Sequence, residues 1–339
     1  MMRSLYSGIS GLKNHQTRMD VIGNNIANVN TVGYKTSRVV FQDIFSQTAK
    51  SGSYDLYAKD MNDPDVTLPR NIGGTNPLQI GLGIKLATVD VLHTPAPITR
   101  TDNPFDMMIE GDGFFILQDE NQNYYYTRAG NFYLDDEGYL VSSHGYYVMA
   151  YNYPLEFLDA VEPTGGPDDP NYDPGAPAAV ALGEGLSDKL DKIRLRVQNP
   201  KTDPSSTDYD DTFEPDADNP AFIDLIGFSV GKNGDISVII DNIKQTIGFL
   251  GIGMFSNAGG LEKAGDSLYR ESPSSGHVVE TMALRDGAGR VLGGGLEMSN
   301  VDLATEFTDM IVTQRGFQAN SRVITVSDTL LEELVNLKR

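Results

Sequence analysis

The chain has 339 residues, a formal net charge of −21 and no cysteine. The missing cysteines exclude disulfides and thiolate metal sites. The acidic balance argues against nucleic acid or an anionic membrane surface as a partner. Forty per cent of the residues are apolar, and there are 35 glycines and 17 prolines. The length therefore allows two or three domains with a real core, and the turn residues indicate substantial β structure.

The N-terminal segment has the pattern of an amphipathic helix. Residues 3–30 contain no proline, and their apolar side chains form one stripe at helical spacing. We predict an N-terminal helix within 1–33, with Ser4 as its N-cap and Gly33 as its C-terminal stop. A linker or extended segment over 34–75 should follow. The stripe consists of Leu5, Ile9, Leu12, Met19, Ile22, Ile26 and Val29.

The middle of the chain changes to period two, which is typical of strands. Residues 76–150 and 221–296 are predicted to form one discontinuous β domain. The Asn233-Gly234 pair between two apolar runs indicates a tight hairpin. Further strands are predicted at four aromatic segments: 114–117, 124–127, 131–134 and 146–149.

A segment of different composition interrupts this predicted domain. Residues 151–220 carry sixteen acidic and five basic side chains and ten of the seventeen prolines. An exposed insertion or small outer domain has this composition, and so does a disordered loop, so both interpretations stay open. Within the segment, only 193–197 alternates like a strand.

The C-terminal segment predicts a second, longer helix. Starting at Leu303, alternating steps of four and three residues meet apolar side chains at seven of ten positions. This helix should lie within 297–339, with Ser299 or Asn300 as its N-cap. The expected fold is therefore α+β, with a coiled-coil-like pair of long terminal helices around a β-rich middle.

The helical stripes need a partner, because a narrow apolar seam is rarely stable alone. The two helices can pair within one chain, and the same surfaces can contact other copies. The sequence leaves open how these contacts are shared. The side chains expected at such an assembly interface are Leu5, Ile9, Leu12, Ile22, Ile26, Leu303, Phe307, Met310, Phe317, Ile324 and Leu331.

Motifs that carry chemistry are missing from the sequence. The four histidines lack the spacing of a helical metal pair, and no phosphate-binding loop or nucleophile elbow occurs. The acidic cluster over 208–218 lacks the glycine and terminal glutamate of a calcium loop. We therefore expect no catalytic residue, metal, cofactor or small-molecule substrate.

Both ends of the chain carry recognisable sequence motifs. One is Met-Arg-Ser-Leu-Tyr-Ser-Gly-Ile-Ser-Gly-Leu at 2–12, continued over 20–35. The other lies at 296–303 and 310–320. The two resemble the N-terminal and C-terminal signatures of the bacterial flagellar rod and hook proteins. Motifs at 111–115, 126–132 and 255–261 are similar to the β domain of that family. The family-motif residues near the end of the first helix are Asn24, Asn25, Asn28, Asn30 and Gly33.

The resemblance implies a structural subunit of the flagellum and not an enzyme. Copies would polymerise through their terminal helices into a tubular core, with the β domain outside. The other implied partners are neighbouring rod and hook–filament junction proteins and the flagellar type III export apparatus. Export would occur without a cleaved signal peptide, which places the protein in the hook or basal body.

Within the family, residues 73–83 and 334–339 look more like hook members than distal rod members. A hook subunit that transmits torque from rod to filament is therefore the first expectation, and a distal rod subunit is the alternative. A soluble binding module that uses the helices only for attachment is a further alternative.

Overall fold

The computed structural model describes residues 2–52, 58–60, 63–68, 75–152, 189–195, 197–198, 222–223, 227–240 and 243–337. They fall into two compact units. The first, which we call the helical unit, comprises Met1–Ala27, Ser37–Leu92 and Val301–Arg339. The second, the β unit, comprises Asn28–Thr36 and His93–Asn300.

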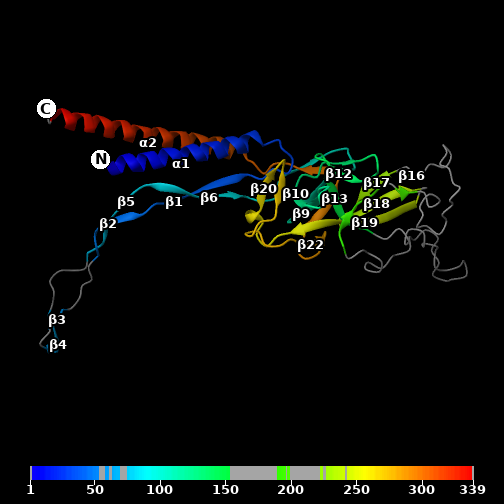
Figure 1. The fold of residues 1–339 in the computed structure, drawn as a ribbon, viewed down its shortest axis with the longest axis horizontal. Coiled ribbons are helices and arrows are strands. Elements are labelled where there is room, and N and C mark those ends of the chain that lie inside the picture. Colours follow the sequence, from blue (N-terminus) through cyan, green and yellow to red (C-terminus); the bar gives the residue numbers. More distant parts are fainter. Residues whose placement is uncertain are drawn as a thin grey trace, which may run out of the picture. The chain divides into compact units, whose positions relative to one another are not determined.

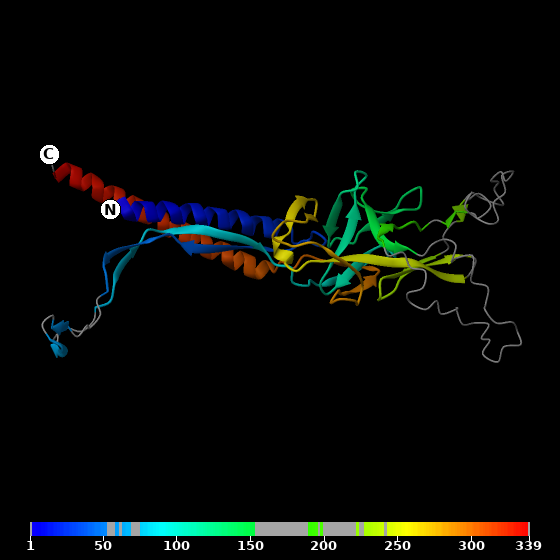
Figure 2. The same ribbon diagram turned by 60° about the horizontal axis from the view of Figure 1, so that its bottom comes forward.

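The helical unit contains both predicted terminal helices. Helix α1 spans Met2–Ala27 and α2 spans Leu303–Leu337, and the two lie side by side in both ribbon views (Figures 1 and 2). The predicted ends of α1 are wrong. Ser4 lies inside the first turns instead of capping them, and the helix ends six residues before Gly33. The four asparagines at 24–30 explain the early end, since their side chains compete for backbone hydrogen bonds.

The start of α2 is capped by Asp302, and the expectation of Ser299 or Asn300 is wrong. The Asp302 carboxylate accepts hydrogen bonds from the backbone N–H of Ala304 at 2.9 Å and the hydroxyl of Thr305 at 2.8 Å. Both hydrogen bonds lower the pKa of Asp302, and the bond from the Thr305 hydroxyl has the larger effect. An aspartate at this position also complements the helix dipole.

The rest of the helical unit is an antiparallel ribbon built from residues 37–91. Its return strands β5 and β6 lie inside the range predicted for the β domain, while β1 to β4 lie within the predicted linker. Strands β2 and β5 are exposed along their whole length, and Phe45 beside them is 83% exposed. The pairs are β1 (Ser37–Asp43) with β6 (Ile84–Val91), β2 (Ser46–Lys50) with β5 (Leu78–Gly81), and β3 (Ala58–Asp60) with β4 (Asp63–Leu68).

The β unit is organised around one large antiparallel sheet, with β19 near its centre (Figure 1). Its described strands are β9 (Phe114–Gln118), β10 (Tyr124–Thr127), β11 (Phe132–Leu134), β12 (Leu140–Ser142), β13 (Tyr147–Asn152), β14 (Asp191–Lys192), β17 (Gly227–Val230), β18 (Asp235–Ile240), β19 (Ile243–Met254), β20 (Glu262–Gly265), β21 (Leu268–Arg270) and β22 (Val279–Met282).

Smaller two-stranded pairs complete the described part of the unit. They are β7 (Ile98–Arg100) with β24 (Gly295–Glu297), β8 (Met107–Glu110) with β23 (Arg290–Gly293), and β15 (Val197–Gln198) with β16 (Phe222–Ile223); a short 3₁₀ turn, η2, spans Ala258–Gly260. The predicted hairpin is confirmed, because β17 pairs with β18 across a turn in which Gly234 has φ +77°.

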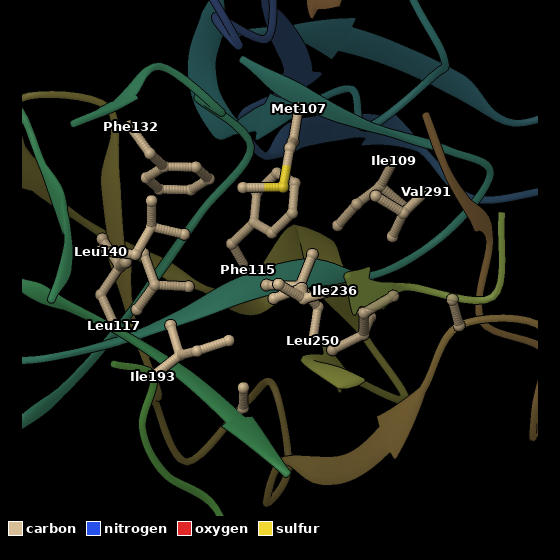
Figure 3. Close-up of a cluster of buried hydrophobic side chains, with 14 of the residues drawn as sticks. Met107, Ile109, Phe115, Leu117, Phe132, Leu140, Ile193, Ile236, Leu250 and Val291 are labelled. Carbon is tan, nitrogen blue, oxygen red and sulfur yellow. The ribbon is translucent and has the colours of Figure 1, made fainter. Parts of the chain in front are cut away.

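The core of the β unit gathers apolar side chains from many strands. Figure 3 shows Met107 above Phe115, with Phe132 and Leu140 to one side and Val291 to the other. The rings of Phe115 and Phe132 meet edge to face at 5.2 Å between centroids. This core explains why the alternating aromatic segments fold as strands with one buried face.

Part of the segment predicted as an insertion belongs to this core. Ile193 and Leu195 are fully buried, and the N–H of Ile193 donates to the carbonyl of Val148 at 3.2 Å. Residues 189–195 are therefore not an exposed insertion. Most of the acidic and proline-rich sequence, over 153–188 and 199–221, lies outside the described residues.

Candidate assembly surface and chain clasp

The face of α1 that meets α2 is made largely of glycine and asparagine. Gly8, Gly11, Ile22 and Asn25 are buried residues of α1, and Asn14 is buried toward the ribbon, where it donates to the carbonyl of Ile84 at 2.8 Å. A β-carbon at Gly8 would lie 3.2 Å from Cγ1 of Ile324 on α2. Small residues let two helix backbones approach closely. The close packing of α1 against α2 therefore depends on glycines as much as on apolar side chains.

The opposing face of α2 alternates polar and apolar side chains. From Glu306 to Leu331, only four of the ten buried or half-buried residues are apolar. The contact is therefore too polar to be found from hydrophobicity alone. These ten residues are Glu306, Asp309, Met310, Thr313, Gly316, Phe317, Asn320, Ile324, Ser327 and Leu331.

Polar bonds fix the register of the two helices. Arg18 donates to the carboxylate of Asp309 at 2.8 Å, although both side chains are partly exposed. Near the end of α1, the buried Asn25 donates to the backbone carbonyl of Ser37 at 2.9 Å and to Glu306 at 3.0 Å, and accepts from the N–H of Ser37 at 3.0 Å. One side chain thus links α1, the ribbon and α2 within the helical unit.

The predicted interface residues divide into two groups in the described helices. Ile22 is buried, and Leu5, Leu12, Ile26, Met310, Phe317, Ile324 and Leu331 are half-buried. The others are open to solvent: Ile9 is 49%, Leu303 38% and Phe307 50% exposed. The first group can contribute to the helix pair of one chain, while the second has no such cover.

Many further apolar side chains on α2 face solvent. Helical spacing places Phe307 and Ile311 on one flank of the seam, and Val312, Val323, Val326 and Leu330 on the other. Exposed apolar surface of this extent marks a contact site. The full set on α2 is Leu303, Phe307, Ile311, Val312, Val323, Val326, Leu330, Leu334, Val335 and Leu337.

The β unit holds a buried ion cluster that the sequence analysis did not find. Lys35 is 0%, Glu297 1% and Arg128 2% exposed. Lys35 donates to Glu297 at 2.7 Å, and the Arg128 guanidinium lies 3.5 Å from the other carboxylate oxygen. Arg128 also donates to the carbonyls of Ile109 and Gly111 at 3.1 and 2.7 Å.

Hydrogen bonds extend from this cluster to neighbouring backbone segments. Lys35 donates to the carbonyl of Thr94 at 2.8 Å, and the N–H of Ala96 donates to Glu297 at 3.2 Å. Asn300 accepts from the N–H of Thr36 at 2.7 Å and donates to the hydroxyl of Thr94 at 2.9 Å. We call Lys35, Thr36, Thr94, Ala96, Glu297 and Asn300 the clasp.

Burial sets the electrostatics of this region. Desolvation lowers the pKa of Lys35 and of Arg128, because each cation has lost the hydration that stabilises its charge. The neighbouring His93 packs edge to face on Phe114 and Tyr269. Desolvation, and then the charge of Arg128, lower the pKa of His93 to about 4.

The family-motif residues have identifiable structural roles at the end of α1. Asn25 forms the links described above, and Asn28 accepts from the hydroxyl of Thr31 at 3.1 Å. Gly33 has φ +67°, and its N–H donates to the carbonyl of Glu297 at 2.8 Å. Asn24 and Asn30 are exposed.

Neither described helix is long and apolar enough to cross a membrane. Among the described residues, no three histidine, aspartate or glutamate side chains come together as a metal site would need. The candidate functional features are therefore the exposed apolar face of α2 and the clasp. Closely spaced glycines in α1 were the available signal for the helix contact, whereas no local pattern links Lys35 to Glu297.

Comparison with known families supports the resemblance seen at both ends. Residues 5–35 match the family described as flagella basal body rod protein. Residues 108–185 match the flagellar hook protein FlgE/F/G D1 domain. Residues 292–337 match the C-terminal family of the flagellar basal body rod FlgEFG proteins.

Whole-length relatives agree with these matches. The flagellar basal-body rod protein FlgG of Bacillus subtilis is 42% identical over 341 residues, covering 100% of both chains. The flagellar hook proteins FlgE of Borreliella burgdorferi and Treponema pallidum are 32% and 30% identical over 455 and 478 residues, again covering 100% of each chain. The chain belongs to the flagellar rod and hook family of axial structural proteins.

Proposed function

We propose that copies of this chain polymerise through α1 and α2 into a tubular axial structure of the flagellum. The observation that carries the proposal is the apolar face of α2, where ten large side chains are exposed. A face this apolar requires cover. Because its exposed residues lie on opposite flanks of the helix seam, one neighbour could not cover all of them. Two or more neighbouring copies could do so through non-closing contacts.

The contacts within one chain and between copies use different residues in this proposal. The half-buried set around Phe317 and Ile324 would form a coiled-coil-like pair with α1. Leu303, Phe307 and Ile9, from the predicted interface, would meet other copies. Leu334 continues the α2 seam and is 50% exposed, so it too is available to a neighbour.

A rod subunit is the better supported of the two family roles. The alignment with the FlgG rod protein spans 341 positions, which is two more than the 339 residues of this chain. The alignment with the Borreliella hook protein spans 455, which is 116 more than 339. A hook subunit remains the second candidate, because the hook relatives also align over their whole length.

The remaining family expectations belong to the same proposal. The neighbouring axial proteins would be the next rod or hook components, and the flagellar export apparatus would deliver the chain to the growing end. The protein would then reside in the basal body or hook.

Charge substitutions on the exposed face of α2 test the polymer. Val326 is 57% exposed in the single chain, so Val326→Asp should leave the monomer folded. Burial of the new carboxylate between copies would cost several kcal/mol per subunit, so the critical concentration for polymerisation should rise at least about 100-fold. Sedimentation and electron microscopy of purified protein measure this, and straight or curved polymers separate the rod and hook roles.

Thr325→Asp is the matched control. It adds the same charge to the preceding exposed residue of α2, whose side chain is already polar. Phe317→Asp, in the half-buried seam, should impair both the helix pair and the polymer. Normal tubes from the Val326→Asp protein would overturn the assignment of this face to subunit contacts.

A further inference from the structure

The chain crosses between its two compact units at four places. The crossings lie at 27/28, 36/37, 92/93 and 300/301. Residues 28–36 enter and leave the β unit as one loop, while 93 and 300 begin and end its main segment. Along the covalent chain, a force applied to the helical unit reaches the β unit through these four connections. How the β unit holds its four chain ends therefore matters for a mechanical subunit.

The clasp ties these ends to one another inside the β unit. Lys35, in the loop, is bonded to Glu297 at 2.7 Å and to the carbonyl of Thr94 at 2.8 Å. Thr36 and Thr94 are both bonded to Asn300, at 2.7 and 2.9 Å. Every crossing thus lies within eight residues of a clasp residue, and the clasp joins all three segments.

The central bonds of the clasp are protected from water. Lys35 and Glu297 are 0% and 1% exposed, so solvent cannot compete for their hydrogen bonds. Bonds between charged groups are roughly twice as strong as neutral ones, and a low local dielectric strengthens them further. A joint built from them should resist opening more than surface contacts would.

The charges of the cluster indicate that Lys35 serves more than stability. Two cations, Lys35 and Arg128, surround one buried carboxylate. Arg128 alone can neutralise Glu297, and it has two carbonyl acceptors besides. Lys35 is the surplus charge, whose burial has a desolvation cost. What it adds is the connection of the loop to Thr94 and Glu297.

We propose that Lys35 is a positioning residue, which closes the clasp so that the four crossings act as one stiff joint and share the load carried by the polymer. This inference rests on the proposed axial function, since a joint of this kind matters only in a subunit under load. Its local consequence, however, is a property of the single chain. The two proposals can therefore fail separately.

The test is Lys35→Met in the full chain, examined by hydrogen exchange of the monomer. The variant keeps an apolar stem of similar length and leaves Arg128 to pair with Glu297, so the melting temperature should change little. The amides of Thr36 and Ala96, which donate to Asn300 and Glu297, should exchange at least about tenfold faster. Strand β9, in the core, should exchange as in the unmodified protein.

Two further variants complete the design. Lys232→Met removes an exposed cation from the turn after β17 and should leave exchange unchanged. Asn300→Ala removes the hydrogen bonds to Thr36 and Thr94 but leaves the buried charges in place, and it should speed hydrogen exchange at Thr36. This second variant keeps the inference testable if Lys35→Met unfolds the β unit.

Polymers provide the mechanical measurement. Lys35→Met polymers should form at the usual critical concentration but bend more, seen as a persistence length lowered about twofold or more in electron micrographs. Unchanged exchange at Thr36 and Ala96 in both clasp variants would overturn the inference, and so would polymers of unchanged stiffness. Failure of Val326→Asp to block assembly would instead overturn the proposed function.

Discussion

Gly11 of α1 lies directly beneath the side-chain amide of Asn320 on α2, so close that a β-carbon at Gly11 would overlap it. Gly11→Ala should therefore destabilise the helix pair by about 1 kcal/mol, because Asn320 must turn away. Thermal unfolding followed by circular dichroism measures the change. Asn320→Ala in the same protein should recover most of the loss, since it removes the obstacle.

Gly23 provides the control within the same helix. A β-carbon there would have no heavy atom within 4 Å, so Gly23→Ala should stabilise the helix by about 0.5–1 kcal/mol through its higher helix propensity. If the two alanine substitutions changed the stability equally, the close contact at Gly11 would not be what limits the packing of α1 against α2.

Removal of the buried carboxylate should be far more damaging than removal of Lys35. Glu297→Gln leaves Lys35 and Arg128 buried together without their anion, and breaking a buried ion pair in this way costs about 3–5 kcal/mol. Chemical denaturation of the β unit should show a loss of this size. In contrast, Glu110→Gln breaks the partly exposed pair with Arg290, 2.6 Å apart, and should cost less than about 1 kcal/mol.

His93 should make the β unit sensitive to mild acid. Its pKa is lowered to about 4, and the cations Arg128, Lys35 and Lys263 face it. Between pH 6.5 and 4 the unfolded chain binds a proton at His93 that the folded chain does not, so stability falls as the pH falls through this range. Because His93 as a whole residue is only half-buried, the loss should be about 2 kcal/mol.

Two variants isolate the His93 contribution, measured as the free energy of unfolding from pH 7 to 5. His93→Phe keeps an aromatic ring against Phe114 and Tyr269 but cannot titrate, so its pH dependence should be flatter. His277→Phe, which replaces a fully exposed imidazole, is the control for the loss of a histidine elsewhere in the chain. A slope unaffected by His93→Phe would assign the acid sensitivity to other groups.

Gly33 should tolerate no side chain. Its φ of +67° already disfavours alanine, and a β-carbon would lie 2.6 Å from the backbone nitrogen of Ala129. Gly33→Ala should therefore cost more than about 3 kcal/mol in thermal or chemical unfolding. Gly276→Ala has the same conformational penalty, with φ +77°, but open space around it, and should cost only about 1–2 kcal/mol. The difference between the two measures the steric conflict with Ala129.

The sequence predicted the elements of this fold better than their contacts. The heptad pattern located α2 correctly, because a helix with a repeating apolar stripe is a local property. It identified the face that contacts α1 only in part. Met310, Phe317 and Ile324 of the predicted stripe lie in that face, but so do the polar Thr313, Asn320 and Ser327, and the predicted Leu303 and Phe307 are exposed. An apolar side chain is expected to be buried, but the sequence does not say against which surface. In a polymer that surface can belong to another copy.

The ribbon and the clasp depend on pairings between distant segments. Strand β1 pairs with β6 more than forty residues later, so the linker interpretation of 34–75 had no local signal against it. Lys35 and Glu297 are 262 residues apart in the chain, and although each lies inside a family signature, nothing in the local sequence pairs one with the other. Ile193 and Leu195 are a different case. Their alternation predicted a strand over 193–197, but the described strands are Asp191–Lys192 and Val197–Gln198, with only an isolated bridge at Arg194 between them. The acidic surroundings favoured an exposed segment, whereas both side chains are buried.

The glycines of the helix pair have a geometric consequence beyond a single chain. Gly8, Gly11 and Gly316 hold no side chain where α1 and α2 meet, so side chains of the opposite helix (Ile324, Asn320 and His15) lie directly against these glycines. In a tube built from such pairs, this close packing recurs at every copy around the circumference. An added methyl group that moves the two helices slightly apart in one chain would be repeated by every copy in a turn, so its effect on the circumference of the tube would accumulate.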